Sequence, residues 1–217
     1  MKTVVYLATK NLYPSASVCI NSLRKNGNID EVFILTEGGF HKDGVTEIDV
    51  SGQAFFPKDS MNAATKWTWM CLMKTAMTEI FPDKGKLLIL DCDTIVEKDI
   101  SLLWEYDIDY YGMARQQDDG RMGRFTQGYY FNAGVLMCNL KKLRDGTEAR
   151  IRKALNEKWY QYPEQDAINE ICKGHITTLP SRYNFCPFTQ ADDNIVIRHF
   201  AACKEWVNGY FYKLYEG

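Results

Sequence analysis

The chain has 217 residues, of which 46% are hydrophobic and 25% are charged, and its formal net charge is −2. This length is enough to bury one core, so we expect a single domain over residues 1–217. The small net charge gives no electrostatic reason to expect a nucleic acid or an anionic membrane as partner. No apolar run approaches membrane-spanning length, and residues 1–7 become polar too soon for a signal peptide, which predicts a cytoplasmic protein.

The seven cysteines are odd in number and form no C-x-x-C pair. Neither a disulfide framework nor a structural zinc site is therefore indicated. We expect reduced and largely buried thiols.

The chain begins with a β-rich stretch, residues 3–8, and Pro14 then opens a segment with helical apolar spacing that ends at Gly27. Residues 31–36 have the composition of a second strand, so the opening is a β-α-β unit with a right-handed crossover. The loop after the first strand lacks a G-x-G-x-x-G pattern but would lie at the carboxyl edge of the sheet. The side chains of this loop could line a slot for a nucleotide base, or they could serve only in the turn and in packing. They are Ala8, Thr9, Asn11 and Tyr13.

Residues 44–57 predict a short strand and an irregular connection, and residues 60–81 predict a helix that Pro82 ends. Lys74 falls outside the apolar face of this helix, and a lysine in such a position is most often a solvated side chain. The apolar face would consist of Trp69, Leu72, Met73, Ala76 and Ile80.

Four consecutive apolar residues, 87–90, predict a strand that is buried on both faces in the middle of a parallel sheet. The strand runs into Asp91, Cys92 and Asp93. Because side chains alternate along an extended chain, Asp91 and Asp93 would point the same way. Two carboxylates at the carboxyl end of such a strand form an acceptor site for a hard divalent cation.

Residues 110–114 and 129–139 predict further strands, with a polar segment between them that we expect to order over a substrate, residues 115–128. The second of these strands contains Asn132, Ala133 and Gly134. Small residues let a ligand approach the backbone closely and leave the Asn132 amide free to bond hydroxyl groups.

Residues 144–159 predict a charged amphipathic helix, and another helix begins at Glu164, Gln165 and Asp166. Side chains of this kind at the start of a helix are most often caps.

Residues 175–200 predict two more short strands, the second of which ends at His199. Strands and helices thus alternate along the chain without an internal repeat. This alternation predicts an α/β fold.

Four stretches in chain order resemble glycosyltransferase family eight, the retaining nucleotide-sugar transferases. A single Asp-x-Asp motif is unspecific, but here Phe-Asn-Ala-Gly-Val follows it by about forty residues, and His-Phe lies near the end. The resemblance implies a GT-A fold, with a mixed and mostly parallel sheet flanked by helices. The matching stretches, which together span nearly the whole chain, are residues 5–23, 87–104, 130–143 and 165–204.

The resemblance also implies roles for individual residues. Asp91, Asp93 and His199 would hold Mn²⁺, or else Mg²⁺, against the diphosphate of a UDP-sugar, and mixed carboxylate and imidazole ligands suit Mn²⁺ better. Gln165 would lie beside the reacting anomeric carbon, and Lys204 would meet the leaving phosphates. The residues expected to contact the substrate are Ala8, Thr9, Asn11, Tyr13, Lys74, Asp91, Cys92, Asn132, Ala133 and Asp166.

Three features depart from the family pattern. Thr9 and Lys10 replace the acidic residue usual after the first strand, which weakens the case for uridine. The spacing from His199 to Lys204 is commonly one residue longer, and Glu205 stands where the family has proline. The sequence also stops soon after this motif, so it is either a minimal enzyme or one domain of a longer protein.

The function implied is metal-dependent, retaining transfer of a hexosyl group from a UDP-sugar, glucose or galactose before other sugars, to a glycan or another hydroxyl acceptor. The Gln165 amide is a poor nucleophile, which favours attack by the acceptor on the face from which UDP leaves. Glu164 is a carboxylate and keeps a double displacement open. The catalytic candidates are Gln165, Lys204 and Glu164.

Two other classes of function stay open. A haloacid-dehalogenase-type phosphotransferase also carries Asp-x-Asp-Thr after an apolar strand, and the acidic pair at residues 192–193 could imitate its distal acids. That motif normally lies near the N-terminus, however, and about ninety residues precede it here. The other class is a non-catalytic nucleotide-sugar-binding module. The oligomeric state is left open by the sequence.

Overall fold

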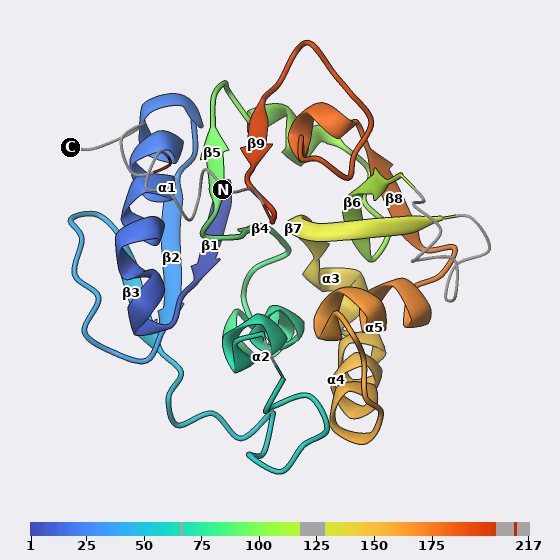
Figure 1. The fold of residues 1–217 in the computed structure, drawn as a ribbon. Coiled ribbons are helices and arrows are strands. Elements are labelled where there is room, and N and C mark those ends of the chain that lie inside the picture. The colour runs from blue at the N-terminus through green and yellow to red at the C-terminus, as the bar shows by residue number, and fades with distance from the viewer. Residues whose placement is uncertain (66, 118–128, 203–210, 212–217) are drawn as a thin grey trace.

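The computed structural model describes residues 1–65, 67–117, 129–202 and 211. Its centre is a seven-stranded sheet with the order β3-β2-β1-β4-β7-β6-β8 (Figure 1). β7 runs antiparallel to both neighbours and the other six strands run parallel, which confirms the predicted mixed sheet. The strands are β1 (Thr3–Leu7), β2 (Glu31–Thr36), β3 (Thr46–Asp49), β4 (Lys86–Leu90), β6 (Tyr111–Gln116), β7 (Tyr130–Asn139) and β8 (Ile176–Leu179).

Helices cover both faces of this sheet. α1 has Pro14 in its first turn and Gly27 at its C-cap, as the sequence predicts. None of the helices among the described residues has the length and apolarity needed to cross a bilayer. The α-helices are α1 (Tyr13–Asn26), α2 (Met77–Ile80), α3 (Leu140–Leu143), α4 (Thr147–Glu157) and α5 (Pro163–Ile171), and the 3₁₀ helices are η1 (Lys10–Leu12), η2 (Trp69–Thr75), η3 (Ser101–Glu105) and η4 (Ser181–Tyr183).

The apolar run of each central strand feeds two cores. On β4, Leu88 and Leu90 pack in the core that α1 closes, whereas Leu87 and Ile89 pack in the core that η2, α4 and α5 close. All four side chains are fully buried. A strand in this position needs apolar residues on both faces, which is why four of them occur in a row.

The strand order changes direction at β1, which has β2 on one side and β4 on the other. The connections that leave β1 and β4 therefore diverge and open a crevice at the carboxyl ends of these two strands. Open α/β sheets bind their ligands at such a switch point. The residues that follow β1 and β4 are those that the sequence analysis selected, 8–13 and 91–93.

A second sheet consists of β5 (Thr94–Val96) and β9 (Ile197–His199), which pair antiparallel. Thr94 lies opposite His199 in this ladder, and the amide of Phe200 donates to the carbonyl of Asp93 at 2.8 Å. Figure 1 shows the two strands side by side above the large sheet. This ribbon brings the end of the described chain back to the end of β4.

The continuous helix expected over residues 60–81 is wrong. The segment contains turns, then η2, then the single turn of α2. η2 buries side chains on every side, among them Met70, Leu72, Met73 and Lys74, so its shape follows its surroundings and not one apolar face. The same burial corrects the expectation that Lys74 is solvated.

Candidate functional site

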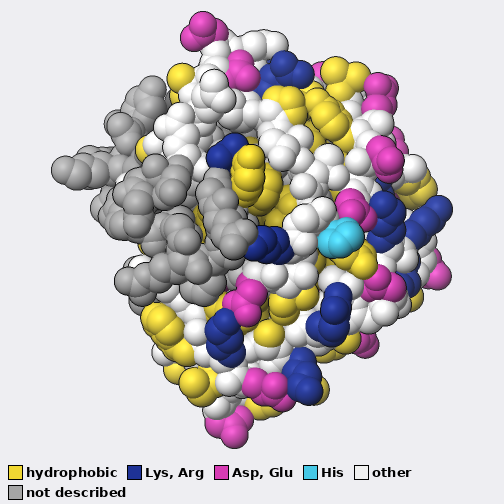
Figure 2. All heavy atoms as spheres, turned by 90° about the vertical axis from the view of Figure 1, so that its right-hand side faces the viewer, with side chains coloured by type: hydrophobic (Ala, Val, Ile, Leu, Met, Phe, Trp, Pro, Cys, Tyr) yellow, Lys and Arg dark blue, Asp and Glu magenta, His cyan; other side chains and the backbone are white. Residues whose placement is uncertain are grey.

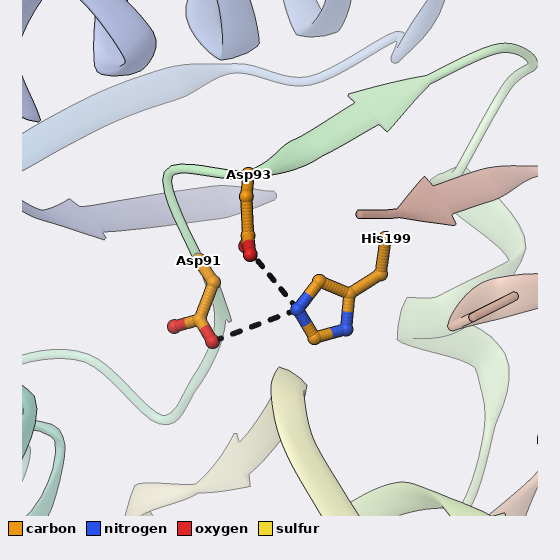
Figure 3. Close-up of side chains that lie close together, drawn as sticks. All are labelled: Asp91, Asp93 and His199. Carbon is orange, nitrogen blue, oxygen red and sulfur yellow. Dashed lines mark ion pairs between the residues drawn. The ribbon is translucent and has the colours of Figure 1, made fainter. Parts of the chain in front are cut away.

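Three potential metal ligands converge where β4 and β9 end (Figure 3). Nε2 of His199 lies 3.2 Å from Oδ1 of Asp93 and 3.9 Å from Oδ2 of Asp91. The two carboxylates face the same space as expected, but they do so from a turn between β4 and β5 and not from an extended strand. The Thr94 hydroxyl supports this turn by donating to the Asp91 carbonyl at 2.8 Å.

The His199 ring rests directly against the backbone of β7. A Cβ added at Gly134 would lie 2.0 Å from Cε1 of His199, far inside contact distance. Nδ1 of the same ring lies 2.8 Å from Oδ1 of Asn184. The glycine expected to admit a ligand therefore admits the imidazole that completes the ligand group.

These residues fit a divalent cation. One ligand atom from each of Asp91, Asp93 and His199 lies within 4.8 Å of the others, and no other such group occurs among the described residues. Nδ1 of His199 is occupied by Asn184, so Nε2 is the nitrogen that faces the carboxylates. Two carboxylates and one imidazole combine the ligand types that Mn²⁺ accepts.

Electrostatics ties the three groups together. Burial lowers the pKa of His199, but the Asp93 carboxylate beside Nε2 raises it to about 10. Burial raises the pKa of Asp91 against the opposing effect of Lys74. His199 overcomes the burial of Asp93 and holds the pKa of that carboxyl below its ordinary value. A cation at this place would take over the role of the imidazolium proton.

Lys74 is a buried cation with three partners. Its Nζ lies 2.7 Å from Oδ1 of Asp91, 3.1 Å from Oε1 of Glu164 and 3.2 Å from the carbonyl of Ala133. Burial lowers the pKa of Lys74, but the two carboxylates outweigh burial and raise it well above its ordinary value. Lys74 is therefore positively charged and joins the metal-ligand group to the start of α5.

The site lies where β7 extends past the end of β4. Leu90, the last residue of β4, pairs with Val135, so residues 130–134 have no β4 residue beside them. Side chains bond this strand edge instead: Asn169 accepts from the Phe131 amide at 2.8 Å and donates to its carbonyl at 2.9 Å. Gln165 accepts from the Ala133 amide at 2.8 Å.

A cavity of about 450 Å³ opens over these residues. It brings together seven of the side chains that the sequence analysis selected, from five separate stretches of the chain. These seven are Lys74, Asp91, Asp93, Asn132, Glu164, Gln165 and His199, and the other lining residues are Trp67, Cys71, Gln116, Tyr162, Pro163, Phe188, Ala201 and Ala202.

The sequence model described as "Glycosyl transferase family 8" matches residues 3–208. The chain belongs to glycosyltransferase family 8. This membership explains the Asp-x-Asp motif, the Phe-Asn-Ala-Gly-Val strand and His199 together. The phosphotransferase alternative has no comparable support, because Asp192 and Asp193 are not part of the described ligand group.

Two curated relatives show how far the similarity extends. The lipopolysaccharide 1,2-glucosyltransferase of Escherichia coli (strain K12) is 32% identical over 111 residues, which are 46% of this chain and 33% of that protein. Glycosyltransferase GlyE of Streptococcus pneumoniae serotype 4 is 34% identical over 110 residues, which are 48% of this chain and 25% of that protein. The chain aligns with 25% to 38% of the length of the curated relatives it matches.

The fold resembles that of a solved galactosyltransferase, LgtC, in complex with donor and acceptor sugar analogs. The TM-score is 0.72 at 21% identity, and the superposition covers 98% of this chain and 94% of the other. This likeness confirms the GT-A fold that the family 8 resemblance implies.

Several selected residues of this family 8 chain lie outside the cavity lining. Asp166 is 1% exposed and lies behind Gln165, with its oxygens bonded to the Tyr130 hydroxyl and the Tyr162 amide. Cys92 is buried and its thiol lies 3.3 Å from the Leu7 carbonyl, which turns it toward β1. Ala133 lines no part of the cavity but contributes its backbone to Gln165 and Lys74.

The candidate base-binding residues lie beyond β1, next to the end of β4. Ala8 is fully buried and Asn11 is exposed. The Thr9 hydroxyl donates to Oδ1 of Asn11 at 2.5 Å, and the Tyr13 hydroxyl donates to the Gly38 carbonyl at 2.9 Å. These side chains line no part of the described cavity, so a base-binding role stays a prediction.

Two further expectations fall outside the described residues. One is Lys204, the candidate contact for the leaving phosphates, and the other is most of the polar segment, residues 118–128. The six described cysteines are all free and five of them are buried, as predicted.

The sequence analysis assigned no role to three polar residues that support the site: Tyr130, Asn169 and Asn184. Each is at most 3% exposed and bonds a selected residue or its backbone. All three lie inside the stretches that resemble the family, residues 130–143 and 165–204. The only signal in the sequence was polarity next to apolar residues, because the partners of these residues are far along the chain.

Proposed function

We propose that this chain is a single GT-A domain over residues 1–217 that transfers a hexosyl group from a UDP-sugar to a hydroxyl group of a glycan or other acceptor, with retention. The observation that carries this proposal is the convergence of Asp91, Asp93 and His199 with Lys74 and Gln165 in one cavity of a family 8 fold. The printed names of two similar proteins, a glucosyltransferase and a galactosyltransferase, support glucose and galactose as the first donors to test.

Asp91, Asp93 and His199 would hold the cation, for which we propose Mn²⁺ ahead of Mg²⁺ because imidazole is a softer ligand than oxygen. When bound, the ion would offset the negative charge that grows on the departing diphosphate. Lys74 adds positive charge from the protein itself and holds the Asp91 carboxylate in place. We propose that Lys204 adds charge at the leaving phosphates.

The protein holds both candidate nucleophiles by hydrogen bonds. Oε1 of Gln165 accepts from the Ala133 amide, and its Nε2 donates to the Tyr130 hydroxyl at 3.0 Å. The Glu164 carboxylate lies 3.1 Å from the Lys74 ammonium. The Gln165 amide is neutral and a poor nucleophile, and the Lys74 ammonium offsets the charge of the Glu164 carboxylate. Both facts favour attack by the acceptor on the face from which UDP leaves, with the Gln165 dipole held beside the reacting carbon.

The partners we propose are a UDP-sugar and a hydroxyl-bearing acceptor. On the face of the molecule in Figure 2, basic and acidic side chains are interspersed among neutral and hydrophobic ones. We propose no nucleic acid as a partner, because a nucleic acid site would need basic side chains gathered in a patch or stripe.

The test is release of UDP from a panel of UDP-hexoses, in Mn²⁺ and again in excess chelator, with Asp93→Asn as the matched inactive variant. Mn²⁺-dependent release of UDP by the wild type alone supports the proposal, and NMR of the glycosyl product then reports retention. Release of phosphate from a phosphomonoester without release of UDP would instead support a phosphotransferase. Tight binding of a UDP-sugar without turnover across the panel would support a binding module.

A further inference from the structure

Asn184 joins two sides of the site without reaching the cavity. It follows η4 and has no exposed surface. Its Oδ1 lies 2.8 Å from Nδ1 of His199, and its Nδ2 lies 2.9 Å from Oδ1 of Asn132. His199 and Asn132 both line the cavity, whereas Asn184 does not.

The two ends of this amide are chemically different, and its orientation decides which nitrogen of His199 carries a proton. The NH₂ group of Asn184 can only donate, so it faces the acceptor oxygen of Asn132. The oxygen of Asn184 then faces His199, and it can bond only a ring nitrogen that carries a proton. A proton on Nδ1 of the neutral ring leaves the lone pair on Nε2, the nitrogen nearest Asp91 and Asp93.

Asn132 is fixed in the same way. Its Oδ1 accepts from the amide of Gly134 at 2.9 Å as well as from Asn184. With both acceptor positions used, only the NH₂ group of Asn132 remains for the cavity. Asn132 can therefore donate to an oxygen of the bound substrate but cannot accept from one of its hydroxyl groups.

We propose that Asn184 is a positioning residue that sets the hydrogen-bond polarity of the site: it makes His199 present a lone pair to the metal ion and makes Asn132 a pure donor toward the UDP-sugar. This inference rests on the proposed function, since it takes His199 as a metal ligand. Partners that orient a ligating histidine raise its affinity for metal by fixing the ring and its tautomer.

The first experiment titrates Mn²⁺ into the protein, alone and with UDP, and follows free Mn²⁺ by EPR. Asn184→Ala removes the acceptor of Nδ1–H, and we expect Mn²⁺ affinity to fall by about 10- to 100-fold. Asn184→Asp keeps an acceptor toward His199 and should stay within about threefold of the wild type. The aspartate loses the donor to Asn132, however, so it should weaken a UDP-sugar relative to UDP by about tenfold.

The matched control is Asn62→Ala. Asn62 is 1% exposed and makes three hydrogen bonds, to the backbone of Leu155, Lys158 and Tyr160, but it lines no part of the cavity. We expect it to lose stability with Mn²⁺ affinity unchanged. An equal loss of Mn²⁺ affinity in Asn62→Ala would mean that the effect of Asn184→Ala is general destabilisation.

The tautomer of wild-type His199 decides the question even if Asn184→Ala fails to fold. The chain has three histidines, so ¹H–¹⁵N correlation of the imidazoles in the protein loaded with Mg²⁺ and UDP is simple to assign. We expect a proton on Nδ1 of His199 and none on Nε2. A proton on Nε2, or Asn184→Ala with wild-type Mn²⁺ affinity, overturns this inference alone. A wild type that binds no Mn²⁺ overturns the proposed metal site as well.

Discussion

The two halves of β7 differ in what lies along their edge. Residues 135–139 pair with β4 on one side, and the side chains of residues 135–138 belong to the two cores. Residues 130–134 extend past β4 and pair with β6 only at residues 130–132, and the side chains of Asn169, Gln165 and Lys74 bond the freed backbone. One continuous strand thus forms the wall of the site in its first half and part of the core in its second half.

The difference shows how a sheet can hold polar side chains precisely. A neighbouring strand would use the N–H and C=O groups of Phe131 and Ala133 for a regular ladder. Here the ladder stops because the chain turns after Leu90 toward β5 and β9. Backbone groups have fixed directions, so the side chains that replace the ladder take fixed positions too. If this account is correct, changes in the two halves should have different consequences.

The largest effect should come from Asp93→Asn, which removes a ligand charge beside the unpaired half of β7. Residues that only support a ligand are worth about 10- to 100-fold in metal affinity, so we expect a loss of at least about 100-fold in Mn²⁺-dependent binding of UDP. Calorimetry with UDP in Mn²⁺ measures it. The control is Asp109→Asn, a half-buried carboxylate paired with His175 and Lys142 near the start of β6, which should leave UDP binding normal. Unchanged binding in Asp93→Asn would remove the metal assignment.

A second test adds one methyl group beside each half of β7, at Gly134 in the unpaired half and at Gly112 of β6 opposite the paired half. Gly134→Ala places its Cβ inside the His199 ring, and we expect His199 to move and Mn²⁺ affinity to fall by about 10- to 100-fold. Gly112→Ala, opposite Met137 in the paired half, places its Cβ 2.7 Å from Cδ1 of Ile108. Overpacking should cost either variant about 1–3 kcal/mol in the free energy of unfolding.

Only Gly134→Ala should lose metal, as EPR titration and urea unfolding of the two variants would show. Equal metal affinity in both variants would mean that Gly134 does not set the position of His199.

The same contrast explains what the sequence could predict. β4 and α1 follow from patterns contained in the segments themselves: four apolar residues in a row, and a helix between Pro14 and Gly27. Asp91, Asp93 and His199 were each predicted at the end of a strand. Their convergence, however, depends on β5 and β9, which have three residues each and are too short to carry a pattern.

Lys74 and Asn184 show the limit more sharply. The spacing of apolar residues placed Lys74 in solvent, and it is buried because Asp91 and Glu164 are its partners. Asn184 is an asparagine in an irregular segment, a common place for that residue. Its proposed role depends on its contacts with His199 and Asn132, neither of which is near it in the sequence. Local pattern cannot report a contact between distant segments.

A third test removes a side chain that replaces the ladder. Asn169→Ala leaves the amide and carbonyl of Phe131 without their partner, and each unpaired buried group should cost about 1–3 kcal/mol in the free energy of unfolding. Hydrogen exchange locates the effect. The Phe131 amide should lose protection, whereas the amides of residues 135–139 should stay protected against every opening smaller than global unfolding. A uniform change along β7 would show that the two halves are not independent.

The smallest expected effect concerns two tyrosine hydroxyls, one from the unpaired half of β7 and one from β6 opposite the paired half. The Tyr130 hydroxyl accepts from Gln165 and donates to Asp166, and burial raises its pKa so far that it stays protonated. Tyr111 pairs with Cys138, is fully buried, and its hydroxyl has no hydrogen-bond partner among the described residues. Removing a hydroxyl that orients Gln165 should cost about 1 kcal/mol, or about fivefold in kcat, with KM for the donor little changed.

Tyr111→Phe removes a hydroxyl that bonds nothing in the described structure, so it should leave kcat unchanged and stability equal or higher. Steady-state release of UDP, measured for Tyr130→Phe and Tyr111→Phe side by side, separates these outcomes. A fall in kcat for both variants would point to a general effect of either substitution on the sheet. A rise in KM for the donor without a fall in kcat for Tyr130→Phe would mean that Gln165 acts in binding the donor and not at the reacting carbon.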